Sequence, residues 1–335
     1  MGGRGGDAIA LVEYVDGADF LGAVEAITSR PPPKGDSGVK ADPVKIAEQQ
    51  RLAHDQQQAR DREANEFRNK EIRRAHEIWA GAVALSGSHA ESYLRYRGLE
   101  AAPGAKLRSY QNLAYWHFVR GKWAVIHQGP AMVAAIQGND YRFIGCHITY
   151  IDAPLSTRSG KAQIYDPTTG EILDAKKVRG SQRGGHIHLG GDVDHADCLN
   201  VGEGIETVYS VRQRLLAARR TIEKTVFWSC VNLDNMAGKC ASSVAHPTKT
   251  ITDAKGRVRA AKVKGPIPDL NDSPVLMPPS HFKTIYLLED GDSDPFATRC
   301  TMLRAATRWQ QPDRQIMAAR SITGADFNDM HRGLA

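Results

Sequence analysis

The hydrophobic and polar positions of the N-terminal part of the chain predict helices. Residues 7–28 form two short helical patterns around Asp16 and Gly17, and the Pro- and Gly-rich residues 30–45 predict a linker. Residues 44–85 carry many charges of both signs, almost no Gly or Pro, and apolar residues mainly towards their end. This pattern predicts a long, mostly solvated helix that docks at its C-terminal end.

A short helix and then a set of strands are predicted next. Residues 88–99 are typical of a helix that is capped by Ser88 and ends at Gly98. Residues 107–151 contain four short β-rich runs, which are separated by Gly, Asn-Asp and Gly-Pro turns. These runs predict an antiparallel or mixed sheet.

From residue 198 onward, strand and helix patterns alternate. The predicted strands are 198–202, 225–231, 283–290 and 314–319, and the predicted helices are 206–220 and 296–309. The expected buried face of the second helix is formed by Phe296, Cys300, Leu303 and Thr307. Such alternation is typical of a parallel sheet with helices on its faces.

The fold class is therefore α/β, with the parallel-sheet domain preceded by a mixed α+β subdomain and a long charged helix. We expect an N-terminal segment with a linker at residues 1–40, a helical region at 41–100, a basic α+β subdomain at 101–192 and the parallel-sheet domain at 193–335.

Composition narrows the class of protein. The chain is 41% hydrophobic and 24% charged, and it contains no apolar run of 18 residues, which argues against a transmembrane helix. Its N-terminus lacks the pattern of a signal peptide. The five cysteines form no CxxC pair, so neither a disulfide framework nor a zinc site is indicated. We expect a cytoplasmic protein without a membrane partner.

Charge and aromatic residues suggest a class of partner. The net charge of +6 favours nucleic acid or polyphosphate, and residues 157–185 and 246–268 are rich in Lys, Arg and Gly. Tyr110, Trp116 and Trp123 either stack on bases or, the interpretation that we favour, pack in the core of the β-rich region.

Carboxylates follow three of the predicted parallel strands. Glu203 comes directly after the first, Asp290 and Asp292 end the third, and Asp326 and Asp329 lie just beyond the last. Parallel strands bring such positions to one edge of the sheet. Clustered carboxylates are stable when a cation holds them, and Mg²⁺ or Mn²⁺ suits these hard oxygen ligands.

Structural interpretations compete with this metal site. Asp294 precedes Pro295 at a predicted helix start, which is typical of an N-cap and not of a ligand. Asp326 and Asp329 are equally compatible with turn or cap positions. Glu203 is also compatible with a simple loop position, so spacing favours the metal site without settling it.

Three motifs in this order resemble a known family. VGEGIETVYSV, YLLEDGDSD and GADFNDM are similar to the Toprim domain of bacterial and phage primases, above all the variety of phages, plasmids and integrated elements. The resemblance covers about residues 198–331. It implies that Glu203, Asp290 and Asp292 are catalytic and bind Mg²⁺ or Mn²⁺, together with Asp326 and, less directly, Asp329.

The resemblance extends upstream. The basic stretch 175–191 is similar to the segment before the Toprim domain in such primases, which implies template or nucleotide contacts, made by Lys176, Lys177, Arg179 and Arg183. Residues 2–28 look like the end of a primase zinc-binding module, but the Cys and His ligands are absent. The module is therefore truncated or lost, and no zinc is expected in this chain. Residues 241–282 are longer than a minimal Toprim connection.

The leading hypothesis is primase-type nucleotidyl transfer, which makes short primers on single-stranded DNA from NTPs with divalent metal. A replicative helicase is a further expected partner. The alternatives are a metal-dependent Toprim nuclease and a non-catalytic module that binds DNA or recruits a helicase. A topoisomerase ranks last, since no separate domain with a nucleophilic Tyr is indicated, and no Walker A sequence is present.

Overall fold

The computed structural model describes residues 8–31, 43–253 and 256–335, and the chain divides into two units, residues 1–63 and 64–335. The predicted linker lies mostly outside the described residues. The domain boundaries expected at residues 40, 100 and 192 stay predictions. Within the described ranges, no helix is both long and apolar enough to cross a membrane.

The predicted N-terminal helices are present. Helices α1 (Ala8–Asp16) and α2 (Phe20–Thr28) are separated by Gly17, whose φ of +65° favours glycine. The long helix α3 (Pro43–Gly81) follows. Its C-terminal end is docked as predicted, because Ala75 is fully buried and Ile78 packs against the same hydrophobic cluster.

A four-stranded antiparallel sheet follows helix α4 (His89–Tyr96), which Ser88 caps as predicted by accepting a hydrogen bond from the Glu91 N–H. The sheet has the order β1-β2-β3-β6, and a small hairpin, β4–β5, lies beside it. The strands are β1 (Leu107–Val119), β2 (Lys122–Gln137), β3 (Phe143–Tyr150), β4 (Ile164–Tyr165), β5 (Ile172–Leu173) and β6 (Lys176–Gly180).

The expected break at Gly129 and Pro130 is wrong, since β2 runs through both residues. The pairing of β1 with β2 shifts register between Tyr110 and Leu113, opposite Pro130, so the proline lies at an irregularity that tolerates it. Its carbonyl still accepts a hydrogen bond from the Ile151 N–H.

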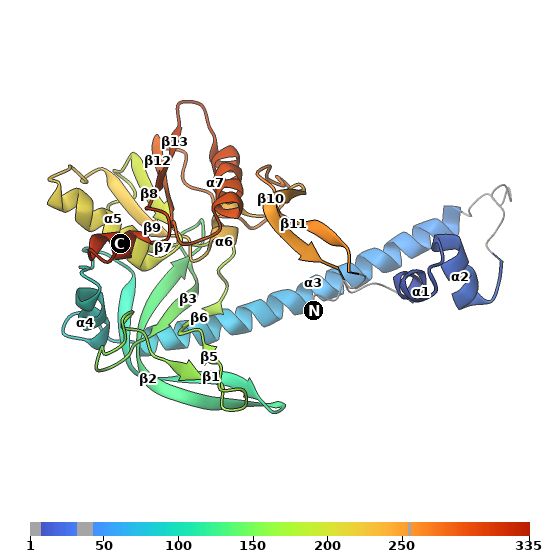
Figure 1. Cartoon of the computed structure of the whole chain (residues 1–335), viewed down its shortest axis with the longest axis horizontal. Coiled ribbons are helices and arrows are strands. Elements are labelled where there is room, and N and C mark those ends of the chain that lie inside the picture. Colours follow the sequence, from blue (N-terminus) through green and yellow to red (C-terminus); the bar gives the residue numbers. More distant parts are fainter. Residues whose placement is uncertain (1–7, 32–42, 254–255) are drawn as a thin grey trace. The chain divides into compact units, whose positions relative to one another are not determined.

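The second sheet has the order β13-β12-β8-β9-β7. Four strands are parallel as predicted, but the edge strand β7 is antiparallel to β9 and was not predicted. The strands are β7 (Ile187–Gly190), β8 (Cys198–Gly202), β9 (Thr225–Ser229), β12 (Thr284–Glu289) and β13 (Gln315–Arg320). The helices of this region are α5 (Ile205–Ala217), α6 (Leu233–Ala237), α7 (Pro295–Trp309) and α8 (Phe327–His331), labelled in Figure 1.

Helices cover both faces of this sheet. Phe227 of β9 packs in one hydrophobic cluster with Val208 of α5, while Trp228 packs in a second cluster with Met302 of α7. Adjacent residues of one strand point to opposite faces. The inner strands β8, β9 and β12 are therefore mostly buried, as their apolar sequences require, whereas the edge strand β13 is mostly exposed.

The predicted buried face of α7 is only partly correct. Cys300 is buried, but Leu303 is 41% exposed, and Arg304 takes a fully buried position instead. The Arg304 guanidinium donates hydrogen bonds to the carbonyls of Gly238 and Gly265, which satisfies its charge inside the fold. A hydrophobicity pattern places arginine on the solvent side and misses this role.

Residues 241–282 contain an antiparallel hairpin of β10 (Ser243–Thr252) and β11 (Val258–Lys264). Figure 1 shows it in orange, extending from the region of α6 and α7. Most of its residues are exposed.

Candidate functional site

The carboxyl ends of β8, β12 and β13 surround a cavity of about 520 Å³. Four of the five carboxylates that the sequence places at strand ends line it: Glu203, Asp290, Asp292 and Asp326. The structure therefore brings together residues that are up to 123 positions apart, because parallel strands end at one edge of the sheet.

The turn after β12 fixes the two aspartates of the predicted pair. The Gly291 N–H, which lies between them, donates to Ser321 Oγ at 2.7 Å and ties this turn to the end of β13. A Cβ atom at Gly291 would lie 2.2 Å from the Ile322 carbonyl oxygen. No other residue fits there without a shift of the backbone.

Asp290 is a half-buried carboxylate with neutral hydrogen-bond partners. Its Oδ2 accepts a hydrogen bond of 2.9 Å from Thr207 Oγ1. Burial raises the pKa of Asp290 to about 7, and the nearby charges of Asp326 and Asp292 add to this rise, while the Thr207 hydrogen bond opposes it. The Asp290 carboxylate thus lies close to other negative charges of the site, which disfavour its ionised form.

Glu203 has a similar electrostatic environment. Its backbone carbonyl accepts a hydrogen bond from Ser229 Oγ at 2.7 Å, which joins the ends of β8 and β9. Burial raises the pKa of the Glu203 side chain; Lys176 lowers it, and the charges of Asp292 and Asp234 raise it further.

Asp326 and Asp329 take different positions. Asp326 is the N-cap of α8, since its Oδ1 accepts a hydrogen bond of 2.6 Å from the Asp329 N–H, and it also lines the cavity. The cap interpretation and the site interpretation therefore both apply to Asp326. The structure does not bring Asp329 into this cavity. Asp329 instead lines a neighbouring cavity, which is also lined by Arg332.

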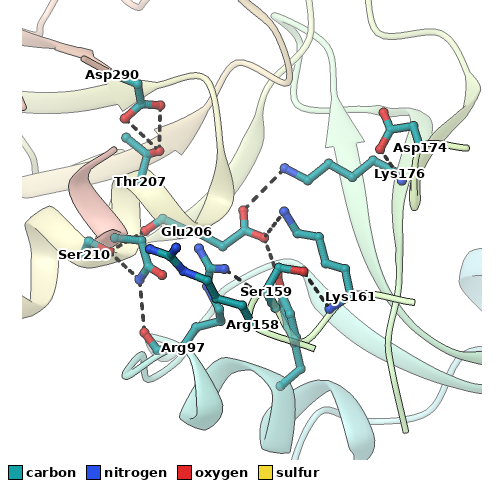
Figure 2. A network of polar contacts seen from close by, with 12 residues as sticks. Arg97, Arg158, Ser159, Lys161, Asp174, Lys176, Glu206, Thr207, Ser210 and Asp290 are labelled. Carbon is teal, nitrogen blue, oxygen red and sulfur yellow. Dashed lines mark hydrogen bonds and ion pairs between the residues drawn. The ribbon is translucent and has the colours of Figure 1, made fainter. Parts of the chain in front are cut away.

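Glu206 is a residue of the site that the sequence interpretation missed. It is 5% exposed at the start of α5, and its carboxylate lies 3.7 Å from Nζ of both Lys161 and Lys176. The Tyr93 hydroxyl donates a hydrogen bond to it. Figure 2 shows both lysines directed at Glu206. The EGIE spacing shows only that Glu206 lies three residues after Glu203 in the chain.

The charge of Glu206 is held by these lysines. Burial alone would raise its pKa, but the charges of Lys176 and Lys161 and the Tyr93 hydroxyl hold the pKa well below its usual range. The pKa of Lys176 is raised, mainly by Glu206. The pKa of Lys161 is lowered: Glu206 acts to raise it, but burial and Lys176 together outweigh this.

The predicted basic residues do not form one cluster. Lys176 and Lys177 line the cavity, but Lys177 Nζ also lies 4.6 Å from the centre of the Tyr115 ring. Arg179 lines a separate surface cavity beside α3. Arg183 pairs with Asp272 at 2.8 Å in a groove next to the site.

His147 of β3 is a second residue of the cavity that the sequence interpretation missed. It is 8% exposed, and its Nδ1 has no hydrogen-bond partner. Burial, and next the charge of Lys176, lower the pKa of His147 to about 4. The imidazole is therefore neutral at pH 7 and offers the cavity a hydrogen-bonding group without charge.

The two tryptophans singled out in the sequence are exposed, which contradicts the favoured interpretation that they pack in the core. Trp116 is 45% and Trp123 is 64% exposed, and both line the surface cavity beside α3. Tyr110 packs against the hydrophobic cluster of the antiparallel sheet, as expected for a core residue.

The donor atoms fit a divalent metal only together with further ligands. Among residues 8–31, 43–253 and 256–335, no group of three or more His, Cys, Asp or Glu side chains is arranged to hold a metal ion. Mg²⁺ usually takes one or two carboxylates together with water and substrate phosphates. Four carboxylates in one cavity, two of them with raised pKa values, provide that type of incomplete donor set.

Comparisons with known proteins give limited information. The model of a domain of unknown function, DUF7146, matches residues 69–189, just over a third of the chain. This match includes β6 and the lysines of the site, but ends before β8. No curated protein matches the sequence.

Among solved structures, the chain is similar to a DNA primase domain from Pseudomonas aeruginosa. The two are 13% identical, the match covers 74% of this chain and 68% of that chain, and the TM-score is 0.35. A likeness of this size carries no argument about function.

Proposed function

We propose that this protein is a primase-type nucleotidyltransferase, which makes short primers on single-stranded DNA from NTPs with Mg²⁺ or Mn²⁺. The observation that carries the proposal is the separation of charge in one cavity. Glu203, Asp290, Asp292 and Asp326 come from the strand ends of the parallel sheet. Cations come from the antiparallel region and α4: Arg97, Lys161, Lys176 and Lys177.

The basic residues retain a surplus of positive charge. Glu206 and Asp174 are the carboxylates on the basic side of the cavity, so the four cations leave a formal surplus of two positive charges on that side, although the cavity as a whole is lined by six carboxylates. A triphosphate carries negative charge that this surplus attracts. Because Lys176 is fixed by Glu206 at 3.7 Å, its ammonium is positioned before a phosphate arrives.

The acidic residues of the cavity would hold the metal. Glu203, Asp290 and Asp292 are the ligands that we propose, with Asp326 close to them; Asp329 stays a weaker candidate. When bound, the ion supplies Lewis acidity towards phosphate oxygens and lowers the pKa of the attacking 3′-hydroxyl. Thr207 orients Asp290 through its hydrogen bond, and the Gly291 turn fixes the separation of Asp290 from Asp292.

The setting that we propose is the replication of a phage, plasmid or integrated element in the cytoplasm, with a replicative helicase as a partner. This part of the proposal rests on the resemblance of the sequence motifs.

Primer synthesis tests the function directly. With single-stranded template, labelled NTPs and Mg²⁺ or Mn²⁺, we expect the full chain to make short oligomers. Glu203→Gln and Asp290→Asn should each lower the rate more than about a hundredfold, since even residues that only orient metal ligands commonly contribute 10- to 100-fold. Glu223→Gln is the matched control, because Glu223 is exposed before β9, at the opposite edge of the sheet.

Other outcomes separate the alternatives. Cleavage of DNA without NTPs, lost in the same two variants, would identify a nuclease. DNA binding that both variants retain, with neither activity in the wild type, would identify a binding module. Asp329→Asn, measured in the same assay, decides whether this residue belongs to the metal site.

A further inference from the structure

The basic excess of the chain is concentrated in one short segment. Seven of the 44 Lys and Arg residues lie between Lys239 and Lys264, but only one of the 38 acidic residues, Asp253. The segment therefore carries a formal charge of +6, which equals the net charge of the whole chain. The other 309 residues carry 37 charges of each sign and are neutral as a set.

This segment contains the β10–β11 hairpin, and one face of the hairpin is completely exposed. Residues paired across an antiparallel ladder point to the same face. The pairs Ser243–Lys264, Ala245–Lys262, Thr250–Ala260 and Thr252–Val258 share one face, and all eight residues are exposed. Apart from its two lysines, this face carries mostly small and hydroxyl-bearing side chains. These leave room for the backbone of a ligand chain to approach.

The cations near the tip are available to a ligand. Arg257 and Arg259 are 60% and 57% exposed, and the carboxylate that they contact, Asp253, lies on the hairpin itself. Lys262 has no ion-pair partner among the residues that the structure describes. Ile251 and Val258 are also exposed, at 57% and 67%, and add apolar contact area.

A groove connects the base of the hairpin to the site. It has a volume of about 460 Å³, and both it and the site cavity are lined by Gln182 and Asn232. The groove is also lined by Ser243 and Lys264 of the hairpin. A chain that leaves the site cavity through this groove therefore reaches the exposed face of the hairpin.

The base of the hairpin is held firmly. The fully buried Arg304 of α7 donates a hydrogen bond of 2.6 Å to the Gly265 carbonyl, directly after β11. Lys249 of β10 lies 2.6 Å from Asp294, the N-cap of the same helix. These contacts fix the hairpin to the parallel-sheet domain although most of its surface faces solvent.

We propose that the β10–β11 hairpin is an arm that binds the phosphodiester backbone of single-stranded DNA as this strand leaves the site through the groove. This inference rests on the proposed function for the origin of the strand. The proposed template is single-stranded, so a single strand and not a duplex is the ligand expected at this groove. Lys262 and Lys264 lie on the exposed face of the hairpin, Arg259 lies on the other face, and Arg257 directly precedes β11; together they give the hairpin a positive charge that attracts such a strand.

A salt titration of DNA binding tests the arm. The variant is the full chain with Arg257→Gln, Arg259→Gln and Lys262→Gln, and the probe is a fluorescent thirty-nucleotide oligo-dT in EDTA, without nucleotides. Each phosphate contact to single-stranded DNA contributes about 0.7 to the slope of log K against log salt, so the slope should fall by about 2. At low salt the affinity should fall more than about tenfold.

The control carries the same change of charge elsewhere. Arg219→Gln, Arg220→Gln and Lys224→Gln alter three exposed cations just before β9, at the edge of the sheet opposite the carboxylates. This triple variant should keep the wild-type slope. Melting curves of both variants check that they are folded.

Three results would contradict the proposal that the hairpin binds single-stranded DNA. These are a wild-type slope in the hairpin variant, an equal loss in the control, and a loss of binding to duplex DNA but not to the single strand. The binding assay needs no catalysis. A lower slope in the hairpin variant, together with a wild-type protein that makes no primers, would therefore support DNA binding by the hairpin and contradict the proposed function. Where synthesis occurs, the hairpin variant should raise KM for template but not for nucleotide.

Discussion

At the scale of single residues, the position of each carboxylate relative to the lysines sets its charge. Glu206 is nearly inaccessible, yet its pKa is held low because two lysines contact it. Asp290 lies across the same cavity, without a contacting cation, and its pKa is raised to about 7. A carboxylate is thus stabilised as an anion on one side of the cavity and destabilised as an anion on the other.

Glu206→Gln should lower the stability of the fold. The amide leaves Lys161 and Lys176 without their shared anion in a largely buried position. Breaking a fully buried ion pair costs about 3–5 kcal/mol, and we expect about 2 kcal/mol here because the side chains of these lysines are 24% and 32% exposed. Denaturant unfolding of the variant and the wild type gives the difference.

The pH dependence of this difference has a definite sign. The pKa of Glu206 is lower in the folded state, so its contribution is present above the ordinary value of 4.5 and is lost as pH falls through the folded pKa. Glu203→Gln is the matched control. The pKa of Glu203 is raised in the folded state, so its ionised form is unfavourable there, and the amide should leave the stability at neutral pH unchanged or higher. Equal stability of Glu206→Gln and wild type would contradict this account.

At the scale of elements, α7 organises the segment that precedes it in the chain. Asp294 caps its N-terminus as predicted, by accepting a hydrogen bond from the Ala297 N–H at 2.8 Å. His246 of β10 also contacts this carboxylate, and Arg308 donates to the Ala237 carbonyl. Polar contacts thus join β10 to this helix, and at the end of α6 they add to the apolar packing of Met236 against Met302.

Arg304→Met should loosen the β10–β11 hairpin. It removes hydrogen bonds to the carbonyls of Gly238 and Gly265 and leaves these carbonyls unsatisfied, at a cost of about 1–3 kcal/mol each. Amide hydrogen exchange should become faster in β10 and β11 and stay unchanged in β12. Arg299→Met, at an exposed position of the same helix, should change neither region. Unaltered protection of the hairpin in Arg304→Met would rule out the anchoring role.

The sequence predicts the elements whose signals are local. The inner parallel strands β8 and β12 are mostly buried, so their apolar runs stand out, and both strands begin and end within two residues of the predicted bounds. The edge strand β7 was missed, because its four residues are strand only through pairing with β9, which is distant in the sequence. Local patterns contain no information on such a partner.

The candidate site likewise contains residues with a local sequence signal and residues whose role depends on distant contacts. Glu203 and Asp290 follow strands directly, so a sequence pattern places them at one sheet edge, where the structure also has them. Their role as metal ligands stays a prediction. Glu206 could not be assigned, because its function depends on Lys161 and Lys176 on a different sheet region, which no spacing within α5 reveals.

At the scale of the molecule, all three hydrophobic clusters lie in the second unit. Their buried residues begin at Ala75 and end at Phe327. The fragment 64–335 should therefore fold by itself, with a melting temperature within about 3 °C of the full chain, because all three clusters remain complete. Calorimetry of the fragment and of the full chain checks this, and aggregation or a clearly lower melting temperature would refute it.

The location of the net charge has a consequence for colloidal behaviour. Outside Lys239–Lys264 the chain is formally neutral, so this segment alone keeps copies of the protein apart by electrostatic repulsion at pH 7. A polyanion that neutralises the segment would bring the molecule to its isoelectric point. Solubility at low ionic strength then depends on ligand stoichiometry, with a minimum where six negative charges are bound per chain.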